Sequence, residues 1–405
     1  MKIVLLCGYY EKQYESEVVT NTKGNVEFSA NEFQRKIIDG LKKNNLDFDV
    51  ISAPLIGSYP NRYKKRVFKP FSERDSNCTY VPFNNLWGLR NFSRAKHLKK
   101  ALGSFIESKD NQKLIIIYSP HTPFLDAAVY AKKKDKNIKL CLVVPDLPQY
   151  MNLNAKQSLL YKIGKKLDIK KFYSLNEKID SYVLLTEQMK DILKVGNRPY
   201  IVKEGIVSSE KLETFSNLNQ KPERNGAIKY LTYTGKVNFQ FGIKELVESF
   251  KQIPDEDLHL VICGAGDAAQ YVTEESKKDK RIEYKGQVLP SEAQKWMEIS
   301  DILINPRRGD GEYTKYSFPS KTIDYLLTGN PVIAYYLDGM PEIYKSLIID
   351  MNINDLFEAL IKSKNINHNN RECLLKSYFL TLSETIFIKN LLTINFPQIN
   401  NKGMS

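Results

Sequence analysis

The stretch His259-Leu-Val-Ile-Cys-Gly-Ala-Gly-Asp267 is an apolar run that opens into a glycine turn. It is followed by a second apolar run, Ser300-Asp-Ile-Leu-Ile-Asn-Pro306, and by Ser317-Phe-Pro-Ser-Lys-Thr-Ile-Asp-Tyr-Leu-Leu-Thr-Gly-Asn-Pro-Val-Ile-Ala334, where a helical stretch precedes another apolar run. Short runs with little polar alternation are typical of strands that are buried on both faces of a parallel sheet. We therefore expect an α/β fold with a doubly wound parallel sheet in this region.

The same alternation extends over the rest of the chain in two series. The first series of strand-like runs covers residues 2–8, 48–52, 114–120, 138–145, 181–186 and 200–205. The second covers residues 229–236, 258–264, 281–286, 301–306, 331–336 and 347–351. Helical stretches lie between these runs, and in residues 242–252 the apolar side chains recur at i, i+3, i+4 and i+7. This pattern therefore predicts two Rossmann-like domains, each with its own parallel sheet.

The boundaries of these domains follow from composition. We expect an N-terminal domain over residues 1–206, a polar linker over 207–227, a second α/β domain over 228–370, and a helical segment over 371–405 that crosses back toward the N-terminal domain. A cleft between two such domains is the usual place for a ligand.

The composition excludes several classes of protein. The chain has 405 residues, of which 42% are hydrophobic and 26% charged, so it is long enough for two globular domains and is not intrinsically disordered. Its apolar runs are far shorter than the roughly 20 residues of a spanning helix, so we expect no membrane span and no signal peptide. The five cysteines are scattered and odd in number, which indicates free thiols in a reducing cytoplasm and no zinc site.

The positive charge of the chain is concentrated in its first half. Residues 1–200 hold 35 Lys and Arg against 20 Asp and Glu, whereas residues 201–405 hold 25 against 27. Residues 54–94 are especially basic and rich in aromatic side chains. Two interpretations of residues 54–94, here called the insertion, stay open. The insertion is either a long surface loop whose aromatic side chains pack on the domain, or a surface that contacts an anionic membrane or a phosphorylated acceptor.

Residues 307–329 carry groups that suit a diphosphate. Pro319 is typical of the first turn of a helix and Gly329 of its end, so the free N–H groups at the helix start and the charge of Lys321 can bind phosphate. Asp324 follows within the helix, where its carboxylate can accept hydrogen bonds from ribose hydroxyls.

In the first half, His121 follows the run 114–120 and is expected at the carboxyl edge of the sheet, where open α/β sheets bind ligands.

The ordered series of motifs resembles the nucleotide-sugar domain of the family-4 glycosyltransferases of GT-B fold, and the resemblance extends weakly back to residue 1. In that family a Glu-Gly-Phe-Pro motif is followed by a second Glu, and here Asp324 stands at the second, ribose-binding position. Tyr316 stands at the first carboxylate position, which makes Glu312 the candidate substitute. Lys236 matches the first basic residue of the family's Gly-Arg/Lys motif, and Phe241 stands where a second Lys is expected.

The resemblance implies roles for further residues. His121, Lys236 and Glu312 are the expected catalytic residues, with His121 reaching the donor sugar. The expected donor-binding residues are Gly235, Lys236, Gly264, Gly266, Val288, Arg307, Ser317, Phe318, Pro319, Lys321 and Asp324. The expected acceptor-binding residues are Gly8, Tyr9 and Asp146.

The resemblance also implies a reaction. The expected activity is that of a retaining, metal-independent glycosyltransferase that moves a hexosyl-type sugar from a UDP-sugar or, as the second choice, a GDP-sugar, with no further cofactor. The expected acceptor is a lipid-linked sugar or an oligosaccharide in capsule, O-antigen or exopolysaccharide synthesis. We expect a cytoplasmic protein, monomeric or weakly dimeric, in peripheral contact with the anionic inner face of a bacterial plasma membrane, and no nucleic-acid partner.

Two other functions stay open at this point. Gly264-Ala-Gly266 after a strand, with Glu283 downstream, is similar to a dinucleotide fingerprint and would fit an NAD-dependent oxidoreductase. The basic first half would fit a nucleic-acid-binding protein, although no nucleic-acid-binding module is present. The Asp-x-Asp pairs at 47–49 and 255–257 do not follow a strand, so we expect them to be solvated charges rather than metal ligands.

Overall fold

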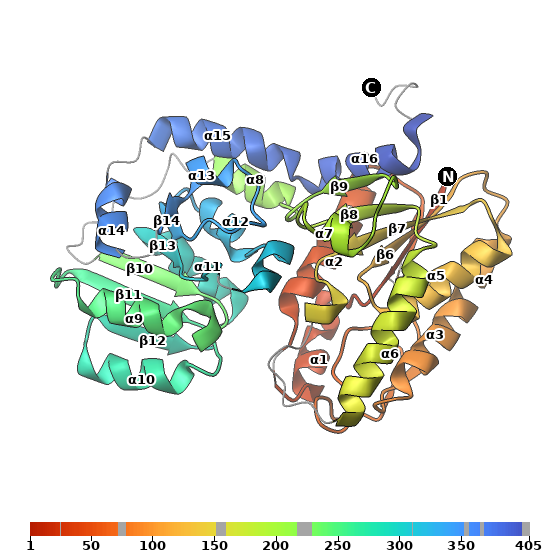
Figure 1. The fold of residues 1–405 in the computed structure, drawn as a ribbon, viewed down its shortest axis with the longest axis horizontal. Coiled ribbons are helices and arrows are strands. Elements are labelled where there is room, and N and C mark those ends of the chain that lie inside the picture. Colours follow the sequence, from red (N-terminus) through yellow and green to blue (C-terminus); the bar gives the residue numbers. More distant parts are fainter. Residues whose placement is uncertain are drawn as a thin grey trace. The chain divides into compact units, whose positions relative to one another are not determined.

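A computed structural model of the chain describes residues 1–24, 26–71, 78–150, 159–216, 229–309, 311–351, 356–364 and 368–398. The chain divides into two compact units (Figure 1). Unit 1 comprises Met1–Ile206 and the C-terminal helix α16 (Glu384–Asn395), and unit 2 comprises Val207–Ser383.

Unit 1 is built on a seven-stranded parallel sheet in the order β4-β2-β1-β6-β7-β8-β9. Its strands are β1 (Lys2–Cys7), β2 (Phe48–Ser52), β4 (Cys78–Tyr80), β6 (Lys113–Tyr118), β7 (Ile138–Val144), β8 (Ser181–Leu184) and β9 (Tyr200–Val202). The six strands that the sequence predicts in this half are confirmed. The edge strand β4 was not predicted, because its three residues lie inside the basic insertion and have no apolar run of their own.

Helices cover both faces of this sheet. They are α1 (Glu15–Asn21), α2 (Phe28–Lys43), α3 (Arg90–Ala101), α4 (Gly103–Glu107), α5 (Thr122–Lys134), α6 (Leu159–Asn176) and α7 (Met189–Ile192), together with α16. Helices α3, α5 and α6 lie side by side, and α2 lies against α16 (Figure 1). The helices bring apolar side chains onto the strands, so the ends of the strands stay available for loops with polar functions.

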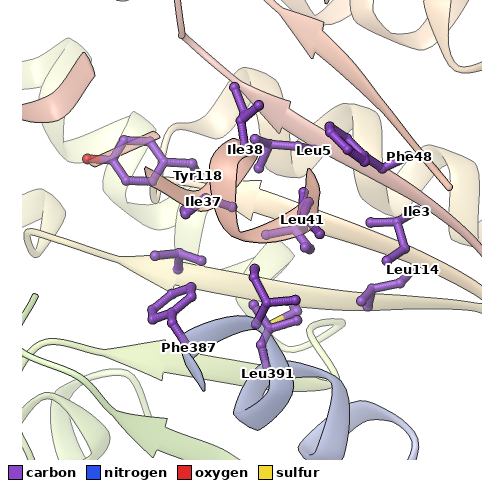
Figure 2. Close-up of a cluster of buried hydrophobic side chains, with 14 of the residues drawn as sticks. Ile3, Leu5, Ile37, Ile38, Leu41, Phe48, Leu114, Tyr118, Phe387 and Leu391 are labelled. Carbon is purple, nitrogen blue, oxygen red and sulfur yellow. The ribbon is translucent and has the colours of Figure 1, made fainter. Parts of the chain in front are cut away.

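The core of unit 1 explains why the C-terminal helix belongs to it. Phe387 and Leu391 of α16 pack with Ile37 and Leu41 of α2 over the strands (Figure 2). Gly40 makes this contact possible, because a Cβ atom there would lie 2.5 Å from the main-chain oxygen of Glu384. The expected helical segment over 371–405 therefore contains two helices: α15 (His368–Thr381) lies in unit 2 and α16 in unit 1.

Unit 2 is built on a six-stranded parallel sheet in the order β12-β11-β10-β13-β14-β15. Its strands are β10 (Lys229–Thr234), β11 (Leu258–Cys263), β12 (Ile282–Gly286), β13 (Ile302–Asn305), β14 (Val332–Ala334) and β15 (Ile349–Asp350), and all six confirm the sequence prediction. Its helices are α8 (Ser209–Ser216), α9 (Ile243–Lys251), α10 (Ala269–Lys278), α11 (Pro290–Ile299), α12 (Lys321–Leu326), α13 (Tyr344–Leu347), α14 (Leu356–Lys364) and α15. The i, i+3, i+4, i+7 stripe of α9 is buried in the core, as its period predicts.

The segment expected as a linker begins with a packed helix. Phe215 of α8 is buried and makes an edge contact with Phe379 of α15. Lys211 of the same helix forms an ion pair with Asp324 of α12. The remainder of the expected linker, 217–227, lies outside the described residues.

Most of the aromatic side chains of the insertion pack on unit 1. Tyr63, Phe68 and Phe83 are buried, and the rings of Phe68 and Phe83 are stacked with centroids 5.0 Å apart. The strands β3 (Val67–Phe68) and β5 (Phe83–Asn84) pair with each other in this region. Trp87 and Phe92 differ, because they remain exposed. Within the described residues, no helix has the length and apolarity that a transmembrane span requires.

Candidate functional site

In unit 2 the loops after β10 and β11 are joined backbone to backbone. The amide of Gly235 donates to the carbonyl of Cys263 (2.9 Å), and the amide of Val237 donates to that of Ala265 (3.0 Å). A Cβ atom at Gly264 would lie 1.7 Å from the oxygen of Gly235, and one at Gly266 would lie 2.1 Å from the oxygen of Val237. Glycine is therefore required at both positions, and the pairing fixes the backbone next to Lys236.

This packing gives the Gly264-Ala-Gly266 turn a different role from that of a dinucleotide fingerprint. In such a fingerprint the second glycine lets the backbone approach a pyrophosphate, whereas here the space in front of Gly266 is filled by Val237 and Asn238. Glu283, the downstream acid, contacts Nδ1 of His259 (2.9 Å) near the amino ends of β11 and β12. The glycine turn and Glu283, the two features that supported an oxidoreductase, are thus both engaged in contacts within unit 2.

The loop after β13 reaches the same edge. Gly242, at the start of α9, has φ = 79°, and a Cβ atom there would lie 2.2 Å from the carbonyl oxygen of Pro306. Arg307 follows, and its guanidinium lies 5.7 Å from the ring centroid of Phe241 and 5.4 Å from that of Tyr313. Its Nη2 donates to Oγ of Ser317 (2.6 Å). A fixed cation therefore stands against the aromatic ring of Phe241.

Helix α12 is held against the end of β10 by Tyr325, a residue to which the sequence analysis assigns no role. The hydroxyl of Tyr325 accepts a hydrogen bond from the amide of Thr234 (2.8 Å) and donates to its carbonyl (2.9 Å). Tyr325 is fully buried, and this burial raises the pKa of its hydroxyl. The expected end at Gly329 is confirmed by its φ of 76°.

The start of this helix differs from the expectation. It begins at Lys321 and not at Pro319, whose carbonyl instead accepts from the amide of Thr322 (2.8 Å) in a turn. The helix has only six residues, so its dipole contributes little to phosphate binding. The charges of the neighbouring side chains matter more at this edge.

The carboxylate of Asp324 lies between two lysines. Nζ of Lys211 lies 2.7 Å from Oδ1 and Nζ of Lys321 lies 3.5 Å from Oδ2, while about a quarter of the Asp324 side chain remains exposed. Lys321 therefore interacts with Asp324 and is not directed at a phosphate alone. Lys211 was missed because it lies 113 residues earlier in the chain, in a segment that reads as a linker.

The other predicted donor residues are placed around these loops. Lys236 follows β10 and is exposed, Val288 follows β12 and is partly buried, and Glu312 is exposed in the 3-10 helix Glu312–Tyr316. Ser317 donates to the carbonyl of Tyr313 (3.1 Å). The ring of Phe318 is buried against Tyr344, with centroids 5.1 Å apart, so only its main chain can face a ligand.

In unit 1, His121 follows β6 and caps the start of α5. Its carbonyl accepts hydrogen bonds from the amides of Phe124 (3.0 Å) and Leu125 (3.2 Å). Burial, with Arg94 and Arg90 nearby, lowers the pKa of the His121 imidazole to about 3. The imidazole is therefore neutral near pH 7, so it can donate or accept a hydrogen bond but cannot supply a charge.

The predicted acceptor residues lie at the ends of strands in the same sheet. Gly8 and Tyr9 follow β1, and Asp146 follows β7 and is exposed. The amide of Gly8 donates to Oε1 of Gln34 (2.8 Å), and Tyr9 is buried in the core of unit 1. The strand order β1-β6-β7 places these residues along one edge with His121, and Asp146 is the most accessible of them.

The comparisons with known proteins concern the family of unit 2 and the fold of the chain. Residues 228–363 match the family described as glycosyl transferases group 1. No curated protein matches the chain significantly. The chain is similar in structure to the lipopolysaccharide outer core galactosyltransferase WaaB, with 12% identity, a TM-score of 0.59, and 98% of this chain and 100% of that chain covered.

Two further solved structures extend this finding. Sucrose-phosphate synthase from Thermosynechococcus elongatus is 15% identical with a TM-score of 0.59, and the match covers 100% of both chains. HepE from Anabaena, solved in complex with UDP, is 13% identical with a TM-score of 0.54, and the match covers 99% of both chains. The expected fold class is confirmed: the chain has the GT-B fold, with two parallel-sheet domains.

Proposed function

We propose that this protein is a retaining glycosyltransferase that uses a nucleotide diphosphate sugar. The observation that carries the proposal is the convergence of the loops after β10, β11 and β13 at one edge of unit 2, with Lys236 and Arg307 on them. The match of residues 228–363 to glycosyl transferases group 1 covers the same loops, which supports this choice of reaction.

The cations at this edge suit a departing diphosphate. When the bond between the sugar and the diphosphate breaks, negative charge grows on the phosphate oxygens, so cations fixed in advance stabilise the transition state more than the bound substrate. Arg307 is held by Ser317 and two aromatic rings, and Lys236 lies on a loop that two interloop hydrogen bonds fix. We assign these two residues to the diphosphate.

The remaining donor groups bind the nucleoside and the sugar. We assign the carboxylate of Asp324 to the ribose hydroxyls, with Lys211 as the residue that positions it. The main chain of Ser317 and Phe318 and the exposed carboxylate of Glu312 are assigned to the sugar. In unit 1, the neutral imidazole of His121 is assigned to a hydrogen bond with a sugar hydroxyl.

The acceptor that we propose is a lipid-linked sugar or oligosaccharide of a bacterial surface polysaccharide. The basic excess of residues 1–200 supports an anionic acceptor or surface on this half of the chain. We further propose that the reaction needs no metal ion. Full turnover in excess EDTA is expected, and loss of turnover that Mg²⁺ or Mn²⁺ restores would contradict this part.

A thermal-shift panel of UDP, GDP, dTDP and NAD tests the donor. We expect UDP, or GDP as the second choice, to raise the melting temperature of the full chain, while NAD leaves it unchanged. Stabilisation by NAD alone would overturn the proposal in favour of an oxidoreductase. With a donor identified, the anomeric configuration of the product, read by NMR from the coupling constant at the transferred carbon, tests retention.

A further inference from the structure

The outward face of α6 in unit 1 carries apolar side chains where a surface helix normally carries polar ones. Ile163 and Leu167 lie one helical turn apart, and Leu167 is 64% exposed. Lys162, Lys166 and Lys170 are also exposed and lie on the adjoining side of the helix. Over its whole length, α6 has five lysines and one aspartate.

The neighbouring insertion places more exposed apolar side chains beside this helix. Trp87 and Leu89, just before α3, are each 53% exposed, and Phe92 in the first turn of α3 is 74% exposed. Trp87 reaches α6, because a Cβ atom at Gly164 would lie 3.7 Å from its ring. Nδ2 of Asn91 in α3 lies 3.5 Å from Oδ1 of Asp168 in α6, so α3 and α6 are also in contact one helical turn after Gly164. The exposed side chains of the two segments therefore form one surface.

Most of the exposed charged side chains around this surface are lysines, and Asp168 of α6 is an exposed acidic side chain among them. On helix α3, Lys96 and Lys100 are exposed, whereas Lys99 is paired with Asp126 (2.9 Å) and Arg94 is buried. Lys171 of α6 is paired with Asp126 (3.1 Å), whereas within the part of the chain that the structure describes, Lys162, Lys166 and Lys170 form no ion pair. Exposed apolar side chains surrounded by cations on one face differ from the scattered exposed apolar residues of ordinary protein surfaces.

We propose that this surface, made by Trp87, Leu89, Phe92, Ile163 and Leu167 with the lysines of α6, binds an anionic lipid bilayer. Aromatic and aliphatic side chains insert at the boundary between the headgroups and the acyl chains, while lysine ammonium groups remain among the anionic headgroups and their stems cover apolar area. The charge complementarity selects an anionic bilayer over a second copy of this chain, because two such faces would bring like charges together. This inference rests on the anionic surface proposed above for the basic half of the chain, and its test does not depend on transferase activity.

Vesicle binding of the full chain is the direct test. Vesicles of phosphatidylcholine with and without phosphatidylglycerol are sedimented with the wild type, with the double variant Phe92→Gln/Leu167→Gln, and with Lys162→Gln/Lys166→Gln/Lys170→Gln. We expect the wild type to bind only the phosphatidylglycerol vesicles, and each variant to lose about tenfold or more in partition coefficient. Raising the salt concentration should weaken the remaining binding, because the charges are exposed.

A matched control comes from unit 2. Phe357 and Leu380 are also one exposed phenylalanine and one exposed leucine, at 48% and 59%. Phe357→Gln/Leu380→Gln should therefore retain full vesicle binding.

Trp87 gives a local readout, since the chain has only two tryptophans. In a Trp296→Phe background, the emission of Trp87 should shift to the blue with phosphatidylglycerol vesicles.

Each contrary outcome overturns the inference. These outcomes are absence of vesicle binding by the wild type, equal loss in the unit 2 control, or binding that survives both unit 1 variants. Self-association that Phe92→Gln/Leu167→Gln abolishes, without any vesicle binding, would identify this surface as a contact between two copies of the chain and would also overturn the inference.

The thermal shift with UDP is measured in parallel. A missing shift with normal vesicle binding contradicts the proposed function and leaves this inference standing.

Discussion

Replacing Gly264 with alanine tests how the loops of unit 2 hold the donor site. The backbone there has φ = 141°, which costs an L-residue about 1–3 kcal/mol. The new Cβ atom would lie 1.7 Å from the oxygen of Gly235, whereas real Cβ contacts are essentially never shorter than 3.0 Å. The two loops must therefore separate by at least about 1.3 Å.

This separation has two measurable consequences. It strains the hydrogen bonds from Gly235 to Cys263 and from Val237 to Ala265, each worth about 1 kcal/mol. Together with the backbone strain, we expect a loss of about 3–5 kcal/mol in the free energy of unfolding of unit 2. It also moves Lys236, and a displacement of about 1 Å at a positioning group can reduce kcat/KM by about 10²-fold.

The matched control is Gly286→Ala. Gly286 also has a positive φ, 68°, but a Cβ atom there meets nothing within 4 Å. We expect it to cost only about 1–2 kcal/mol and to leave UDP binding unchanged. Urea denaturation followed by tryptophan emission, with the thermal shift by UDP measured on the same samples, compares the two variants. If Gly264→Ala matched Gly286→Ala in both stability and UDP response, the interloop packing would not be what positions Lys236.

Three further predictions concern charged or titratable groups. Lys236→Ala should reduce kcat about 10²-fold, as for loss of one preorganised oxyanion donor; full turnover would exclude Lys236 from the diphosphate. Asp324→Asn should weaken UDP binding about tenfold or more and Lys211→Met by less, because a hydrogen bond to a charged group contributes about 1.5–3 kcal/mol; calorimetric titration distinguishes them, and equal affinity in Asp324→Asn would contradict the ribose contact. The pKa of His121 is lowered to about 3, so as pH falls below the unfolded value of about 6.5 the unfolded chain takes up this proton first, and stability falls by up to about 1.4 kcal/mol per pH unit. His121→Gln should flatten this slope between pH 6.5 and 5, and an unchanged slope in urea titrations would show that His121 is not buried in this way.

Much of the fold could be predicted because parallel strands that are buried on both faces have a local signature. The runs from residues 2–8 to 347–351 each became a strand, and the stripe of α9 became a buried helix face. The strand β4 could not be predicted, because it is stabilised by pairing with β2 rather than by its own composition. The break between α15 and α16 was also missed, because residues 371–405 are expected as one helical segment.

The candidate site was predictable where residues are adjacent in sequence and unpredictable where they are distant. The motif around Pro319 indicated Asp324, but Lys211, Tyr325 and Thr234 contribute through contacts over about a hundred residues. Likewise, the sequence showed Phe241 in place of an expected lysine, and only the structure placed the guanidinium of Arg307 against its ring.

The amino-acid sequence alone was enough to predict the two parallel sheets and the strand ends that carry polar loops, and to propose candidate site residues in local motifs, because these depend on local hydrophobic pattern and turn chemistry. Only the folded chain shows which glycines are required, which two lysines contact Asp324, and that burial lowers the pKa of His121. These properties arise from atoms that are distant along the chain and in contact only after folding, so no local pattern in the sequence contains them.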